Sequence, residues 1–152
     1  MLWIEAPQDP AGRRDLNRWA VHFIDPQQWS GHGSVLADVD ADGGLDVALA
    51  NHDFDNRAGE RTVAWYENPR NESDARQAPW SVHEPYRGDE LHTKPQVAVD
   101  DLDRDGRKDL VGVLVPAQGD LPGDRAAVFW MRNEGGDVFD RGSRLRRLRG
   151  RS

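Results

Sequence analysis

Short apolar runs rich in β-branched and aromatic residues alternate along the chain with clusters of Gly, Pro, Asn and Asp. This pattern is typical of β-strands joined by turns, and no stretch shows the apolar period of an amphipathic helix. The runs predict strands at residues 2–5, 19–24, 34–38, 45–51, 62–67, 80–85, 96–101, 109–115 and 126–132. The pattern therefore indicates an all-β fold.

The sequence also repeats itself, at offsets of 61 to 65 residues. Residues 2–22 return as residues 64–83, and residues 35–50 return as residues 98–113. The aromatic and imidazole side chains that match are Trp3 with Trp65, Trp19 with Trp80, and His22 with His83. Four strands in each period suggest that one period forms one blade of a β-propeller.

The repeat divides the chain into parts that begin and end within a blade. Residues 1–24 supply the last two strands of a preceding blade, residues 25–86 form one blade, and residues 87–140 form another with a weak fourth strand at its end. Residues 141–152 form an Arg-rich tail that we expect to be disordered. The prediction is an incomplete β-propeller of about two and a half four-stranded antiparallel blades. Because a closed propeller typically has about four blades or more, we expect further blades from a longer chain or from self-association.

Two acidic loops occupy equivalent positions in the two periods. Residues 38–46 (DVDADGGLD, the first loop) and residues 101–109 (DLDRDGRKD, the second loop) both fit the pattern DxDxDGxxD. Calcium prefers about six to eight hard oxygen ligands, and alternating Asp residues in a tight loop turn carboxylates toward one point. Gly43 and Gly106 permit a backbone conformation that a larger residue would resist. At position seven the expected ligand is a backbone carbonyl group, from Gly44 in the first loop and Arg107 in the second. The other expected ligands are side-chain carboxylates, those of Asp38, Asp40, Asp42, Asp46, Asp101, Asp103, Asp105 and Asp109.

Two alternatives compete with this prediction of two Ca²⁺ sites. An EF-hand needs a Glu at position twelve and a helix on each side, whereas position twelve is Leu49 or Gly112 and the flanks resemble strands. Solvated acidic turns would also contain Asp and Gly. Two matched copies at equivalent positions of a repeat favour the metal sites.

The loops and their flanking strands resemble the FG-GAP or VCBS repeats of integrin alpha-chain propellers and of many secreted bacterial proteins. The resemblance covers about residues 2–140, although the Phe-Gly and Gly-Ala-Pro segments of that family are not visible. It implies that each acidic loop joins the innermost strand of a blade to the next strand and binds calcium. It also implies an extracellular or periplasmic location.

Charge and composition narrow the choice of partners. The formal net charge is −7, but the tail holds six Arg and no acidic residue, so residues 1–140 carry a charge of −13. Such a surface repels nucleic acid and anionic membranes and attracts divalent cations. No apolar run approaches the roughly 20 residues of a membrane helix, and the first residues do not resemble a signal peptide. The sequence contains no Cys, which excludes disulfides, thiolate metal sites and cysteine nucleophiles.

Repeated tryptophans give a second group of candidates. Trp3, Trp65 and Trp130 occupy one framework position, and Asn68 and Asn133 follow the latter two after three residues. The indole rings could stack on sugars, or they could pack between blades while Asn closes a turn. Repetition at one position favours packing.

The remaining histidines are expected on the face opposite the acidic loops, because consecutive connections in an antiparallel blade alternate between its two ends. His32, His52 and His92 lie in these connections, close in sequence to several acidic residues. Such groups could bind a second metal or a sugar, could serve as general acid and base, or could be ordinary polar loop residues.

These observations favour a non-catalytic, calcium-stabilised binding or scaffold module of an extracellular protein, with a glycan or an extracellular protein as candidate partner. The alternative is a fragment of a carbohydrate-active enzyme of the lyase or dehydratase type, with its site on the face that carries the histidines. The segment WYENP at residues 65–69 resembles strands of aldos-2-ulose dehydratases. No Ser/His/Asp arrangement or phosphate-binding Gly loop is readable, so the sequence identifies no reaction.

Overall fold

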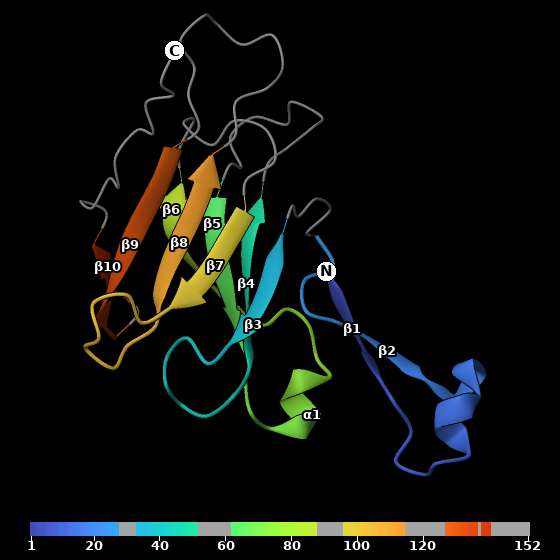
Figure 1. Cartoon of the computed structure of the whole chain (residues 1–152). Coiled ribbons are helices and arrows are strands. Elements are labelled where there is room, and N and C mark those ends of the chain that lie inside the picture. Colours follow the sequence, from blue (N-terminus) through green and yellow to red (C-terminus); the bar gives the residue numbers. More distant parts are fainter. Residues whose placement is uncertain (28–32, 52–61, 88–95, 115–126, 137, 141–152) are drawn as a thin grey trace, which may run out of the picture. The chain divides into compact units, whose positions relative to one another are not determined.

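The structure is a computed structural model, and it describes residues 1–27, 33–51, 62–87, 96–114, 127–136 and 138–140. These residues form ten β-strands in three antiparallel sheets, of two, four and four strands, with one short α-helix and two 3₁₀ helices (Figure 1). The predicted all-β fold is therefore confirmed. No helix among the described residues is long and apolar enough to cross a membrane.

The chain divides into two compact units. The first consists of Met1–Trp29 and Asn68–Ser81, and the second consists of Ser30–Glu67 and Val82–Ser152.

The first unit contains a two-stranded sheet. Strand β1 (Leu2–Glu5) pairs antiparallel with β2 (Ala20–Phe23), and the helices η1 (Gly12–Arg14) and η2 (Leu16–Arg18) lie in the connection between them. Both strands agree with the sequence prediction within one residue. One face of the sheet carries four exposed apolar side chains, those of Leu2, Ile4, Val21 and Phe23.

A short helix that the apolar pattern did not predict completes this unit. Helix α1 (Glu72–Ala75) begins after Asn71, whose side chain accepts a hydrogen bond from the Ser73 backbone N–H at 2.9 Å. The indole N–H groups of Trp3 and Trp80 both donate to the backbone oxygen of Ala75, at 3.3 and 3.0 Å. One carbonyl group at the end of α1 therefore accepts hydrogen bonds from two of the repeated tryptophans.

The second unit contains two four-stranded sheets, in each of which every strand pairs with the next strand of the sequence. The first sheet consists of β3 (Ser34–Ala37), β4 (Asp46–Asn51), β5 (Thr62–Glu67) and β6 (Ser81–Arg87). The second sheet consists of β7 (Gln96–Asp100), β8 (Asp109–Leu114), β9 (Ala127–Gly135) and β10 (Val138–Asp140). The predicted strands are present within a few residues, and the weak fourth strand expected after Trp130 is β10.

The two sheets share their pairing register at the positions that match in the sequence repeat. Ala37 lies opposite Asp46 where β3 meets β4, and Asp100 lies opposite Asp109 where β7 meets β8. The same correspondence holds one strand further, because Trp65 and Trp130 each face the third residue of the preceding strand. The sequence similarity therefore extends to the backbone pairing.

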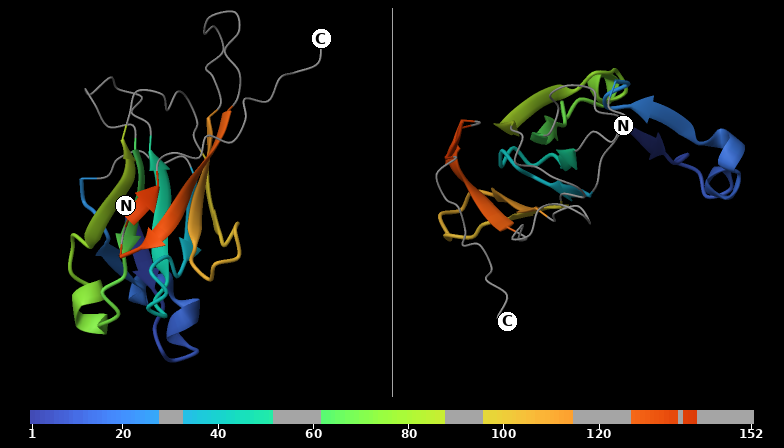
Figure 2. Two further views of the ribbon diagram at one scale, coloured as in Figure 1. Left: turned by 90° about the vertical axis from the view of Figure 1, so that its left-hand side faces the viewer. Right: turned by 90° about the horizontal axis from the view of Figure 1, so that it is seen from above.

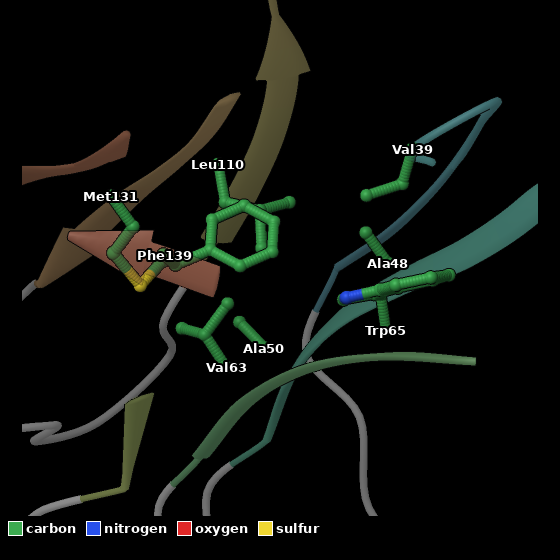
Figure 3. Close-up of a cluster of buried hydrophobic side chains, with 8 residues drawn as sticks. All are labelled: Val39, Ala48, Ala50, Val63, Trp65, Leu110, Met131 and Phe139. Atoms are coloured by element: carbon green, nitrogen blue, oxygen red, sulfur yellow. The ribbon is translucent and has the colours of Figure 1, made fainter. Parts of the chain in front are cut away.

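The hydrophobic core of this unit lies between the two sheets, which form two layers (Figure 2). Trp65 and Val63 from β5 and Ala48 and Ala50 from β4 share a buried cluster with residues of the second sheet (Figure 3). The partners from the second sheet are Leu110, Met131 and Phe139, and Val39 of the first loop completes the cluster. Burial of a large aromatic ring between two layers explains how a chain of low mean hydropathy forms a core.

Candidate metal-binding loops

The first and second loops project from the same end of the two four-stranded sheets (Figure 1). In the first loop, carboxylate oxygens of Asp38, Asp40 and Asp42 lie within 4.8 Å of one another. In the second loop, carboxylate oxygens of Asp101, Asp103 and Asp109 do so, and the third member of this group is at position nine instead of position five. Each loop therefore brings three of its predicted ligands together, and these groups include neither Asp46 nor Asp105.

The backbone follows the same path in both loops. Position four has a left-handed conformation in each, with φ of 64° at both Ala41 and Arg104. Position six is left-handed as well, with φ of 89° at Gly43 and 93° at Gly106, as expected for a position that favours glycine. The N–H of this glycine donates to the position-one carboxylate in both loops, at 3.1 Å to Asp38 and 3.0 Å to Asp101.

The aspartate at position nine of each loop bonds the backbone at the start of that loop. Asp46 and Asp109 are both fully buried, and each carboxylate accepts a hydrogen bond from the backbone N–H of position two. The Val39 N–H lies 2.8 Å from Asp46 Oδ2, and the Leu102 N–H lies 3.0 Å from Asp109 Oδ2. These bonds connect the start of each loop to the strand that follows it.

Position seven donates its N–H to the position-five carboxylate in both loops. The distances are 2.7 Å from Gly44 to Asp42 and 2.9 Å from Arg107 to Asp105. The proposed ligand at this position is the carbonyl oxygen of the same residue, so the N–H bond leaves that role open.

The first loop concentrates negative charge. Asp38 Oδ1 is buried and has no hydrogen-bond partner among the residues that the structure describes. Burial raises the pKa of Asp40 above its ordinary value, and the negative charges of Asp42 and Glu67 add to the rise. A cation at this position would relieve the repulsion and would provide a partner for the buried oxygen.

The second loop is neutralised by arginine side chains. Arg132, on β9, donates from Nε to Asp103 Oδ2 and from Nη2 to Asp105 Oδ2, the latter at 3.2 Å. The hydrogen bond and the charge of Asp103 raise the pKa of Arg132. Arg107 also pairs with Asp105 through its guanidinium group. The carboxylates at positions three and five therefore have positively charged partners here.

Asn133 links the two loops. Its backbone N–H donates to Asp109 Oδ1 at 2.9 Å, and its side-chain amide donates to the carbonyl groups of Lys108, at 3.0 Å, and Val39, at 3.3 Å. Its side-chain oxygen accepts from the Gly135 N–H at 2.9 Å, just as Asn68 accepts from the Arg70 N–H at 3.0 Å. The prediction that Asn closes a turn after Trp65 and after Trp130 is confirmed.

Two of the repeated tryptophans, Trp3 and Trp65, stack on histidine rings. The rings of Trp65 and His83 stack at 4.1 Å with an angle of 9°, and His83 Nε2 lies 3.0 Å from Glu67. The rings of Trp3 and His22 stack at 4.5 Å, and His22 Nε2 lies 2.9 Å from Glu5. Trp65 is 1% exposed, so the packing role is confirmed for that ring and a sugar-stacking role is excluded.

Sequence reasoning found the aspartates but missed Glu67 and Arg132. These two residues match each other in the repeated segments VAWYEN and VFWMRN, at a position between the tryptophan and the asparagine. The sequence does contain a signal for them, because this one position of the repeat changes from a negatively charged to a positively charged residue. Its importance could not be judged because the sequence does not show that this strand end faces the acidic loop.

Several candidates from the sequence lie outside the described residues. They are His32, His52 and His92, and also the Arg-rich tail at 141–152. The alternative of a catalytic site on the histidine-bearing connections therefore stays a prediction.

Comparisons of this chain with protein-family models, with curated proteins and with solved structures find no match. The resemblance to FG-GAP or VCBS repeats accordingly stays a prediction that depends on the two acidic loops and on the strand pattern around them.

Proposed function

We propose that this chain is a calcium-stabilised part of a β-propeller and serves as a non-catalytic binding or scaffold module of an extracellular protein. The observation that carries the proposal is the equivalence of the two acidic loops. Both loops gather three carboxylates within 4.8 Å and both adopt left-handed backbone conformations at positions four and six. Such a conformation costs free energy at a non-glycine residue, and it recurs at Ala41 and Arg104.

The donor atoms fit a hard divalent cation. Every side chain in the two groups is a carboxylate, and carboxylate oxygens are the ligands that calcium prefers. The buried Asp38 Oδ1, which lacks a hydrogen donor among the described residues, provides an acceptor in the first loop. Calcium bound to these oxygens would compensate the charge of residues that the fold brings into contact, and would thereby stabilise the folded chain.

The arrangement of strands supports the propeller part of the proposal. Two successive four-stranded antiparallel sheets, each ordered as in the sequence, pack on one another and present equivalent loops at one end. This is the relation expected between neighbouring propeller blades. The binding or scaffold role rests on the family resemblance, and a glycan or an extracellular protein is the proposed partner.

Calorimetric titration of the chelator-treated chain with calcium chloride tests the metal sites. We expect heat from calcium at concentrations up to millimolar and a weaker response to magnesium, which requires a smaller octahedral site. Asp40→Asn should weaken the response. Asp74→Asn is the matched control, because Asp74 is an exposed acid on α1. A folded sample that takes up no calcium at millimolar concentration would exclude the proposal.

A further inference from the structure

The two acidic loops differ in the charge that the neighbouring strand presents to them. The repeat matches Glu67 on β5 with Arg132 on β9. The residues just before them have equivalent pairing partners. Tyr66 pairs with Val47, the second residue of β4, and Met131 pairs with Leu110, the second residue of β8. The same backbone position therefore carries a negative charge in one sheet and a positive charge in the other.

Arg132 supplies the second loop with a cation from the chain itself. Its guanidinium group forms ion pairs with Asp103 and Asp105. It also pairs with Glu134, with 3.0 Å between Arg132 Nη1 and Glu134 Oε1. Charge-assisted bonds of this kind are stronger than neutral ones, and both aspartates of the loop are partly buried. In addition, both carboxylate oxygens of Asp101 accept backbone N–H groups, from Asp105 at 3.0 Å and from Gly106 at 3.0 Å.

Positions one and three of the first loop lack such compensations among the described residues. Asp38 and Asp40 form no ion pair with any residue in the described parts of the chain, whereas Asp103 is paired with Arg132. Asp38 Oδ1 has no donor among those residues, although its counterpart in Asp101 has one. Glu67 lies on β5 at the position that Arg132 holds on β9, so the strand end that supplies a positive charge in the second sheet carries a negative charge in the first.

We propose that Arg132 is an internal counter-cation of the second loop and that it determines which loop takes calcium, so that the first loop binds the metal tightly and the second loop binds it weakly. This inference rests on the proposed function of the loops. Calcium entering the second loop must displace the guanidinium group from Asp103, whereas calcium entering the first loop removes an existing repulsion. Glu67 and Arg132 are thus specificity-determining residues that lie outside the DxDxDGxxD motif.

The test is a calorimetric titration with calcium chloride of the chelator-treated full chain and of two variants, with thermal unfolding of each in chelator. The unchanged chain should show one tight site and a second site at least about tenfold weaker. Arg132→Gln should tighten the second site by about tenfold or more and should lower the melting temperature in chelator. Glu67→Gln, which keeps a hydrogen-bond acceptor for His83, should weaken the first site.

Matched controls exist for both variants. Lys108→Gln removes one positive charge from the second loop, but Lys108 pairs with Asp100 at 3.7 Å and not with the predicted ligands. Glu5→Gln alters the same Trp–His–Glu arrangement in the first unit. Neither control should change the ratio of the two calcium affinities.

The outcomes distinguish this inference from the proposed function. Two sites of equal affinity, or an Arg132→Gln chain whose second site is unchanged, would overturn the role of Arg132 and leave calcium binding intact. If neither the unchanged chain nor Arg132→Gln takes up calcium while both remain folded, then both proposals fail. Should Arg132→Gln fail to fold, Arg132→Met decides: methionine keeps an apolar stem at this position but carries no charge, so an unchanged affinity ratio in this variant would contradict the inference.

Discussion

The first and second loops have the same motif and the same backbone path but different electrostatic surroundings. In the first loop, Asp38 has a buried oxygen without a donor among the described residues, and Asp40 lies near Glu67. In the second loop, Asp103 and Asp105 are bound by Arg132. The comparison teaches that the motif determines the shape of a loop, while a strand end elsewhere in the sheet determines the charge within it.

The sheets that carry the loops also differ at one matched pair of positions, where the large and the small residue are exchanged between strands. Leu49 faces Ala64 in the first sheet, whereas at the matching place in the second sheet Gly112 faces Phe129. The Phe129 ring lies directly over Gly112, because a Cβ atom built on this glycine would be 1.7 Å from the ring Cζ. The large and the small side chain have changed strands, while the space between the strands is filled in both cases.

The largest expected effect comes from breaking this second exchange. Gly112→Leu should destabilise the chain by about 3 kcal/mol or more, since the new side chain and the Phe129 ring would compete for one space. Adding Phe129→Ala recreates the Leu–Ala pair of the first sheet and should recover most of the loss. Denaturant unfolding of the two single variants and the double variant measures the coupling. Additive losses would show that the two positions do not share space.

The next effect concerns what the two loops have in common. Asp46→Ala and Asp109→Ala should each destabilise the chain by about 2 kcal/mol, because each leaves a backbone N–H of position two without its acceptor. Asp46→Asn and Asp109→Asn keep an acceptor oxygen and should cost less. Thermal unfolding in chelator measures these losses without any contribution from calcium. Full stability of the alanine variants would mean that position nine acts only as a metal ligand.

Calcium itself should contribute a smaller and unequal effect. At about ten times the dissociation constant, calcium should stabilise the chain by about 1.4 kcal/mol for each occupied site. If the loops were equivalent and independent, Asp40→Asn and Asp103→Asn would each remove half of this effect. Because Arg132 already compensates the second loop, we expect Asp40→Asn to remove most of it and Asp103→Asn to remove little. Melting temperatures with calcium and with chelator provide the measurement.

The smallest expected effect is a coupling between the loops through Asn133. This side chain bonds Val39 in the first loop and Lys108 in the second. Asn133→Ser should therefore change the calcium affinity of the first loop by a few-fold, equivalent to about 0.5–1 kcal/mol, although Asn133 contributes no predicted ligand. Asn68→Ser is the matched control at the equivalent turn. An unchanged affinity in calorimetric titration would show that the loops act independently.

Much of the fold could be predicted from the sequence because its signals are local. Alternating apolar residues between turn residues located the strands, and the DxDxDGxxD spacing located two loops with left-handed glycines at Gly43 and Gly106. Helix α1 was missed because four residues are too few to show a helical period. Its one local signal is the capping residue Asn71.

Local patterns along the chain are enough to locate the strands and loops, and they place the carboxylates at the spacing that makes them converge. The charge balance of each loop depends instead on contacts between distant segments, because Arg132 bonds Asp103 across a separation of 29 residues. Asn133 and Val39, which join the two loops, are 94 residues apart. A local pattern reports the backbone conformation of its own segment, whereas the electrostatic field at a carboxylate depends on every charge that folding brings close to it.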